Sequence, residues 1–107
     1  MHIIGGKFKK QKIFAPKTVL TRPTSSKIRE TLFNICASRV EDALFLDRFA
    51  GSGAMGLEAL SRGAKEAYFV DKQKLAINTI RKNALSLGIA AQVMLIHSDV
   101  LTCLSKI

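Results

Sequence analysis

The segment from Leu44 to Glu58 constrains the fold of this chain more than any other part of its sequence. An apolar run is followed there by closely spaced glycines and a helix-forming stretch, LFLDRFAGSGAMGLE. The spacing Gly51-x-Gly53-x-x-Gly56 predicts a strand, a tight turn and a helix start, because glycine permits the turn and a close approach of helix to strand. N–H groups at a helix start favour a negatively charged ligand. The segment therefore predicts a nucleotide-type ligand site.

Strands and helices alternate after this segment. The pattern predicts strands over 43–49, 66–70 and 92–97, helices over 54–62 and 75–87, and a further helix beginning within 100–107. Gly63 and Gly88 follow the two complete helices at positions where glycine commonly ends a helix. This order implies right-handed crossovers. We therefore expect an α/β, Rossmann-like fold with a parallel sheet of strand order 3-2-1.

The part of the chain before residue 43 reads differently. Residues 1–14 predict two short extended pieces around a turn at Gly5-Gly6, and five apolar residues there are candidate anchors: Ile3, Ile4, Phe8, Ile13 and Phe14. A helix is expected just after Pro23, where Thr24, Ser25 and Ser26 are candidate caps. Its apolar spacing predicts a buried stripe of Leu32, Ile35 and Cys36.

Three acids lie at or just after the ends of the three predicted strands. Asp71 lies 20 residues after Gly51, where a carboxylate accepts hydrogen bonds from a ribose, and this fits NAD and S-adenosylmethionine equally. Asp47 lies beside the glycine loop, where it would repel a pyrophosphate but complement the ammonium and sulfonium of S-adenosylmethionine. Asp99 fits either an adenine amine or a helix cap, since Ser98-Asp99 precedes a predicted helix. Together the acids favour S-adenosylmethionine, with an NAD-binding oxidoreductase half as an alternative.

Charge points to a polyanionic partner. The net charge is +9, and residues 1–30 hold eight basic residues against the single acid Glu30. A basic arm of this kind predicts nucleic-acid binding, with a solubilising tail as the alternative.

Cys36 and Cys103 are expected to be buried thiols in a reducing, cytoplasmic setting. We expect no metal site, because neither histidine has ligand-spaced neighbours. No apolar run approaches the length of a membrane span, so we expect no membrane association.

Several motifs resemble one known family. The motifs are IIGGK at 3–7, TRPTS at 21–25, RExLFNI at 29–35, DxFAGSGA at 47–54, GLEALSRGA at 56–64 and FVD at 69–71. They cover nearly the whole chain and are similar to those of the bacterial 16S rRNA guanine-N2 methyltransferases. The resemblance implies a Rossmann-like fold, S-adenosylmethionine as methyl donor, and methyl transfer to guanine N2 in small-subunit ribosomal RNA or an assembling 30S subunit.

The resemblance also implies roles for individual residues. Asp47, Gly51 and Gly53 would hold the methionine end of the cofactor, Asp71 the ribose and Asp99 the adenine. The remaining predicted cofactor contacts are Phe49, Lys72 and Val100. The predicted RNA contacts are Lys7, Lys9, Lys10, Lys12 and Arg22. The chain would then divide into a basic RNA-binding arm over 1–22 and a partial cofactor-binding domain over 23–107.

Two departures from the family pattern stand out. Arg48 occupies a position where the family commonly has leucine, and a buried Arg there would need a partner. The chain has only two prolines, Pro16 and Pro23, and so lacks the Asn/Asp-Pro-Pro-Tyr/Phe motif that follows a fourth strand and holds the target base. By resemblance the fold is truncated after the third strand, which leaves the 43–49 strand at an open edge. We therefore expect weak activity from the chain alone, assign no catalytic residue, and keep a non-enzymatic RNA-binding fragment as an alternative.

Overall fold

A computed structural model of the chain describes residues 1–15, 26–48 and 51–98. Its elements in chain order are α1 (Ser26–Ile35), α2 (Ala37–Val40), β1 (Leu44–Arg48), α3 (Ala54–Ser61), β2 (Glu66–Asp71), α4 (Lys74–Leu87), the 3-10 helix η1 (Ala90–Gln92) and β3 (Val93–His97). The strands form a parallel sheet in the order β1-β2-β3. The predicted α/β class and strand order are thus confirmed, while the helix expected within 100–107 lies outside the described residues.

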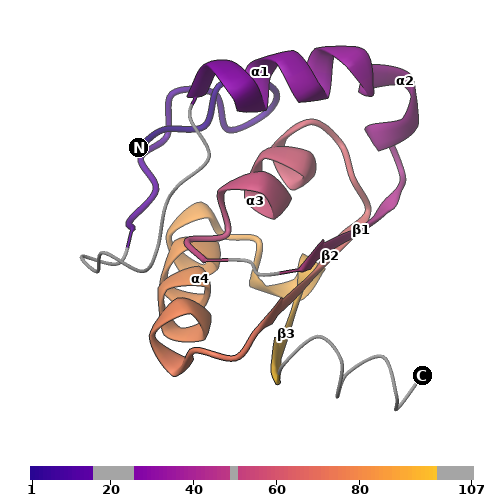
Figure 1. Ribbon diagram of the computed structural model, residues 1–107. Helices are drawn as coiled ribbons and strands as arrows, with labels where there is room; N and C mark the ends of the chain where they lie inside the picture. The colour runs from indigo at the N-terminus through magenta and orange to yellow at the C-terminus, as the bar shows by residue number, and fades with distance from the viewer. Residues whose placement is uncertain (16–25, 49–50, 99–107) are drawn as a thin grey trace.

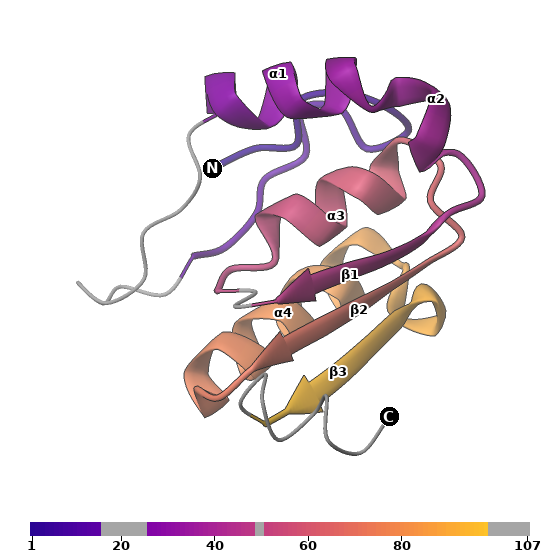
Figure 2. The same cartoon turned by 45° about the vertical axis from the view of Figure 1, so that its right-hand side comes forward.

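Helices α3 and α4 cover the same face of the sheet (Figures 1 and 2). The strand register places Leu46, Tyr68 and Met94 side by side on the opposite face. Leu44 and Leu46 of β1 are exposed on that face, at 65% and 52% of their surface. Parallel sheets usually have both faces covered. Because β1 pairs only with β2 among the described residues, it is an edge strand, and its outer face is apolar. Arg48 lies exposed at its end.

The N-terminal segment packs onto the sheet layer instead of extending from it. Ile3 and Ile13 are buried in the core with Leu57 and Phe69. The two expected extended pieces meet at a single antiparallel bridge, His2 to Lys12, and the residues between them form turns. Phe14 was expected to be an apolar anchor, but it is 37% exposed: its backbone bonds Asn83 of α4, and its ring contacts the Lys82 ammonium. The boundary predicted at 22/23 lies outside the described residues.

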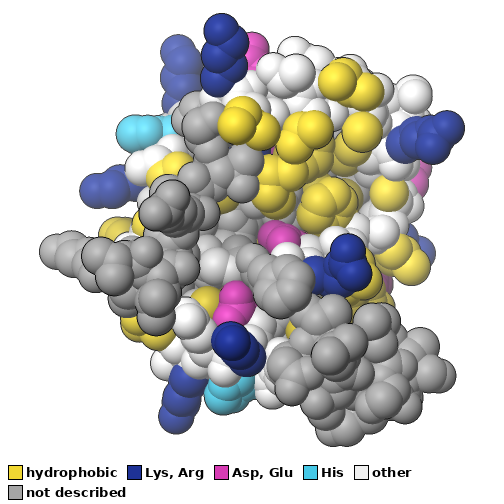
Figure 3. All heavy atoms as spheres, viewed as in Figure 1, with side chains coloured by type: hydrophobic (Ala, Val, Ile, Leu, Met, Phe, Trp, Pro, Cys, Tyr) yellow, Lys and Arg dark blue, Asp and Glu magenta, His cyan; other side chains and the backbone are white. Residues whose placement is uncertain are grey.

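The predicted buried stripe of α1 is wrong. Leu32, Ile35 and Cys36 are all exposed, Ile35 at 75%, whereas Arg29 and Phe33 face the core. Both faces of this helix carry apolar residues, so spacing alone does not decide which face is buried. Figure 3 shows hydrophobic side chains gathered in its upper half, where α1 lies. The helix also ends at Ile35, and Cys36 joins it to α2.

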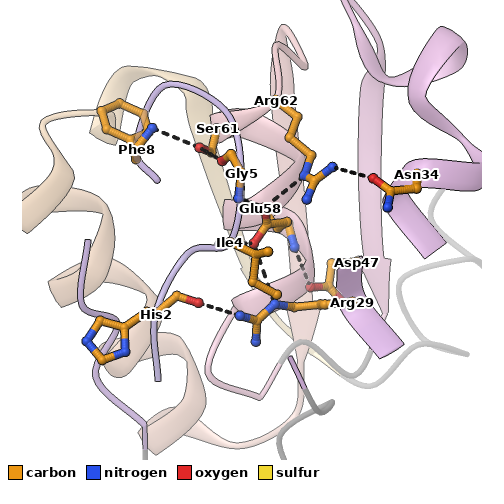
Figure 4. Close-up of polar contacts among 11 residues, drawn as sticks. His2, Ile4, Gly5, Phe8, Arg29, Asn34, Asp47, Glu58, Ser61 and Arg62 are labelled. Atoms are coloured by element: carbon orange, nitrogen blue, oxygen red, sulfur yellow. Dashed lines mark hydrogen bonds and ion pairs between the residues drawn. The ribbon is translucent and has the colours of Figure 1, made fainter. Parts of the chain in front are cut away.

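A buried carboxylate fixes the N-terminal segment to α3 (Figure 4). Glu58 and Arg29 are both 0% exposed, and the Arg29 Nε lies 3.6 Å from a Glu58 oxygen. Glu58 also accepts hydrogen bonds from the N–H groups of Ile4 and Gly5, each at 2.9 Å, and from the Arg62 Nε at 2.8 Å. Arg29 donates to the carbonyl of His2. Burial lowers the pKa of Arg29 and the Glu58 charge opposes that change, so the ion pair keeps the guanidinium charged.

Ser61 extends the same attachment by one helical turn. Its hydroxyl donates to the Gly5 carbonyl at 2.6 Å and accepts from the Phe8 N–H at 2.9 Å, and its carbonyl accepts from the Lys7 N–H at 2.7 Å. Gly6 has φ +78, and a Cβ there would lie 2.0 Å from the Ser61 carbonyl oxygen. Only glycine fits so close to the helix. The Gly5-Gly6 turn and the last turn of α3 therefore form one structural unit.

Replacing Gly56 by alanine should destabilise the protein by about 1–3 kcal/mol. A Cβ at Gly56 would lie 2.3 Å from the Phe69 ring, so α3 and β2 would have to separate. Chemical denaturation measures the effect. In a double-mutant cycle, Phe69→Leu should cost less in the Gly56→Ala background than alone, because the smaller side chain relieves the clash. Equal costs of Phe69→Leu in both backgrounds would contradict this packing.

Candidate functional site

The carboxyl ends of β1 and β2 bring two of the predicted acids to one edge of the sheet. Asp47 lies near the end of β1, and its carboxylate accepts a hydrogen bond from the Gly56 N–H at 3.2 Å. Asp71 ends β2, and its two oxygens accept from the Gly51 N–H at 3.0 Å and the Gln73 N–H at 2.8 Å. Each acid therefore contacts the glycine loop or the helix that follows it.

The glycine loop adopts the backbone that its sequence predicts. Gly51 has φ +58 and Gly53 has φ +81, a region that other residues rarely adopt. A Cβ at Gly53 would lie 2.9 Å from Ile80, so the loop packs directly on α4. Gly56 packs on Phe69, as described above. The turn at Gly51 and the close packing of Gly56 are thus as expected, and the loop is held against the sheet and α4.

Burial strongly raises the pKa of Asp47, one of the two acids. Desolvation, opposed by the hydrogen bond from Gly56 and reinforced by the Asp71 charge, raises the pKa of Asp47 to about 7. The charged form of such a buried carboxyl group is unfavourable by itself, and a cation beside it stabilises the charge. The site is therefore suited to a ligand that brings positive charge to the end of β1.

Asp47 should make the stability of the protein fall between about pH 4 and pH 7. Its pKa is about 7 in the folded protein but about 3.9 when unfolded. The folded state therefore binds more protons in this interval, and the free energy of unfolding decreases as pH rises. Relative to an Asp47→Asn variant, the protein should lose up to a few kcal/mol by pH 8, since one pKa unit corresponds to about 1.4 kcal/mol. Urea denaturation of both proteins across pH checks this, and a pH-independent difference would contradict it.

The position of the Asp47 carboxylate bears on which nucleotide fits. Gly56 is the third residue of α3, and in a dinucleotide-binding loop the N–H groups of this first turn face the pyrophosphate. Here a carboxylate accepts the Gly56 hydrogen bond instead. A second negative group at that place would be repelled. The geometry therefore disfavours a pyrophosphate-containing cofactor and favours one with a cationic group.

Of the other predicted cofactor contacts, the structure describes only Lys72. Lys72 follows Asp71 with an exposed side chain, and its carbonyl oxygen lies 3.0 Å from His97 Nε2. The Ser98 N–H donates to the Asp71 carbonyl at 3.0 Å, so the end of β3 stays beside Asp71. Phe49, Asp99 and Val100 lie outside the described residues. In the described part of the chain no three metal-ligating side chains gather, and no helix is long and apolar enough to cross a bilayer.

The predicted RNA contacts are surface lysines of the N-terminal segment. Lys7, Lys9, Lys10 and Lys12 are all exposed, and Arg22 lies outside the described residues. Because Glu58 and Ser61 hold this segment, its lysines project from a fixed backbone. Whether they contact RNA stays a prediction.

Sequence reasoning missed Asn83 of α4. Its side chain is buried, accepts from the Phe14 N–H at 2.7 Å, and donates to the carbonyls of Phe14 at 2.9 Å and Ser52 at 3.1 Å. One side chain thus joins the N-terminal segment to the glycine loop. The available signal was an asparagine three residues after Ile80, within the apolar stripe of the helix, where a buried amide needs several partners.

Comparisons with known proteins agree with this architecture. A family model described as Conserved hypothetical protein 95 matches residues 1–107. Ribosomal RNA small subunit methyltransferase D of Escherichia coli strain K12 is 39% identical over 106 residues, 99% of this chain and 53% of that protein. The protein of that name from Buchnera aphidicola subsp. Baizongia pistaciae is 39% identical over 107 residues, 99% of this chain and 54% of its own.

One solved structure shows the same fold at similar identity. It is an Escherichia coli protein provisionally described as the methyltransferase yhhF, with a TM-score of 0.89 and 36% identity, covering 98% of this chain and 56% of that one. The match supports a Rossmann-like methyltransferase fold for the described residues. The chain spans about half the length of the curated relatives it matches.

Proposed function

The chain belongs to the family described as Conserved hypothetical protein 95, and we propose that it forms the methyl-donor-binding half of an S-adenosylmethionine-dependent RNA methyltransferase. The proposal rests on the hydrogen bond from the Gly56 N–H to the Asp47 carboxylate. This bond puts an acidic group where a dinucleotide-binding loop would bind a phosphate. The names of the relatives support the reaction class, since they are ribosomal RNA methyltransferases. The reaction supplied by the cofactor is transfer of an electrophilic methyl group from sulfonium sulfur.

The residues at the sheet edge fit such a cofactor. Asp47 would pair with the cationic methionine end, beside the bare backbone of Gly51 and Gly53. Asp71 has two carboxylate oxygens, and each retains acceptor capacity beyond its present backbone hydrogen bond, so it can accept from ribose hydroxyls. Phe49, Lys72, Asp99 and Val100 complete the proposed set of contacts.

The proposed acceptor is guanine N2 in small-subunit ribosomal RNA, free or in an assembling 30S subunit, in the cytoplasm. The basic N-terminal lysines and Arg22 would bind the phosphate backbone, which carries most of the affinity of proteins for nucleic acid. Guanine N2 is a weak nucleophile because its lone pair is delocalised into the ring. Its methylation therefore depends on positioning, and no residue of this chain is assigned to that step.

A methyl-transfer assay tests the acceptor. The chain is incubated with S-adenosylmethionine labelled in its methyl group and with 16S RNA or 30S precursor particles, and the RNA is digested to nucleosides. The proposal predicts label in N2-methylguanosine, at a rate well below that of the full-length Escherichia coli relative. Label in another nucleoside would contradict guanine N2, and RNA binding without any binding of the donor would favour the non-enzymatic alternative.

A further inference from the structure

An exposed aromatic ring between two lysines lies next to the glycine loop. The Lys82 ammonium lies 4.0 Å from the centroid of the Phe14 ring, and the Lys12 ammonium lies 5.8 Å from it. Lys12 comes from the N-terminal segment and Lys82 from α4, so the packing of the two elements creates this group. We name Lys12, Phe14 and Lys82 the Phe14 patch.

Hydrogen bonds with the Asn83 side chain fix the backbone of Phe14 in the Phe14 patch. The Asn83 amide oxygen and nitrogen bond both backbone groups of Phe14, so the ring projects from a fixed main chain. The same amide nitrogen donates to the carbonyl of Ser52, between Gly51 and Gly53. Two carbonyls that share one donor are necessarily close together. The Phe14 patch therefore adjoins the loop at which the methyl donor is proposed to bind.

The two segments that form the Phe14 patch carry charge of a single sign. Residues 1–15 contain four lysines and no acid, and α4 contains Lys74, Arg81 and Lys82 and no acid. These two segments pack together through Asn83. A basic surface with an exposed ring fits single-stranded nucleic acid, because lysines bind phosphates and a base can stack on the ring.

We propose that the Phe14 patch binds an unpaired nucleotide of the RNA substrate beside the methyl-donor loop. This inference rests on the proposed function and adds Phe14 and Lys82 to the RNA-binding surface. The base stacks on the face of Phe14 that the Lys82 ammonium leaves when it turns to a phosphate, and Lys12 binds a second flanking phosphate. The contact positions the RNA strand next to the cofactor; it carries out no chemical step.

Fluorescence anisotropy with a short, labelled single-stranded RNA of mixed sequence tests the Phe14 patch. Phe14→Leu keeps an apolar side chain but removes the ring, and should weaken binding at least about fivefold, the low end of what base stacking contributes. Phe14→Trp should bind as tightly as the unchanged protein, since it retains a stacking surface. Lys82→Gln should reduce the slope of log affinity against log salt by about one.

Lys65→Gln is the matched control for charge. Lys65 is exposed at the opposite end of the sheet, just before β2 begins, and its replacement should leave both affinity and salt slope unchanged. Equal RNA affinity of Phe14→Leu and the unchanged protein, or an equal loss in Lys82→Gln and Lys65→Gln, would overturn the inference. Calorimetric titration of each variant with S-adenosylmethionine tests the proposed function separately: retained donor binding with no RNA effect refutes the Phe14 patch alone.

Discussion

Replacing Glu58 by alanine should lower the free energy of unfolding by about 3–5 kcal/mol, the usual cost of removing one partner of a buried ion pair. Arg29 would remain fully buried without its carboxylate. The N–H groups of Ile4 and Gly5 would lose their acceptor as well. Because these bonds join residues more than 50 positions apart, the N-terminal segment should detach. Urea denaturation measures the stability, and amide hydrogen exchange at Ile4 and Gly5 measures the detachment.

Glu30→Ala is the control for this substitution. Glu30 lies next to Arg29 in α1 but is exposed, so its removal should change stability by less than about 0.5 kcal/mol. Loss of exchange protection at Ile4 and Gly5 should likewise occur only in the Glu58 variant. A loss below about 1 kcal/mol for Glu58→Ala would mean that the carboxylate does not hold the segment.

Replacing Asp47 by asparagine should weaken binding of S-adenosylmethionine by about 10- to 150-fold at pH 8. This range corresponds to one hydrogen bond to a charged group, about 1.5–3 kcal/mol. Asparagine keeps the size of the side chain and removes only its negative charge. Since the pKa of Asp47 is raised to about 7, the carboxyl is largely neutral at pH 5, and the two proteins should bind the cofactor more nearly alike there.

Isothermal titration calorimetry at pH 5 and pH 8 measures this effect. Asp42→Asn is the matched control, because Asp42 is exposed and has φ +61, a conformation that asparagine tolerates. It should bind the cofactor as the unchanged protein does at both values. A loss for Asp47→Asn that is equal at pH 5 and pH 8 would contradict a role for the Asp47 charge.

The glycine loop could be predicted in detail because its signals are local. Gly51, Gly53 and Gly56 fix backbone conformation and close packing, and Gly88 ends α4 as expected. The strand order followed from the Rossmann-like alternation of strands and helices. Two acids could be placed at one sheet edge because parallel strands end together.

The attachment of the N-terminal segment could not be predicted because its signals are distant. Arg29 reads as a surface charge, and only its partner Glu58, 29 residues later, makes its burial favourable. The same pairing turns α1 so that Phe33 faces inward and Ile35 outward. Asn83 likewise bonds Phe14 and Ser52, which both lie far before it in the chain. Spacing within one helix contains none of this information.

Calorimetric titration of the chain with S-adenosylmethionine and, separately, with NAD tests the central claim most directly. Both cofactors present a ribose to Asp71, but only NAD brings a pyrophosphate to the loop where the Asp47 carboxylate bonds Gly56. The account predicts saturable binding of S-adenosylmethionine and none of NAD. Saturable binding of NAD with no binding of S-adenosylmethionine would contradict it.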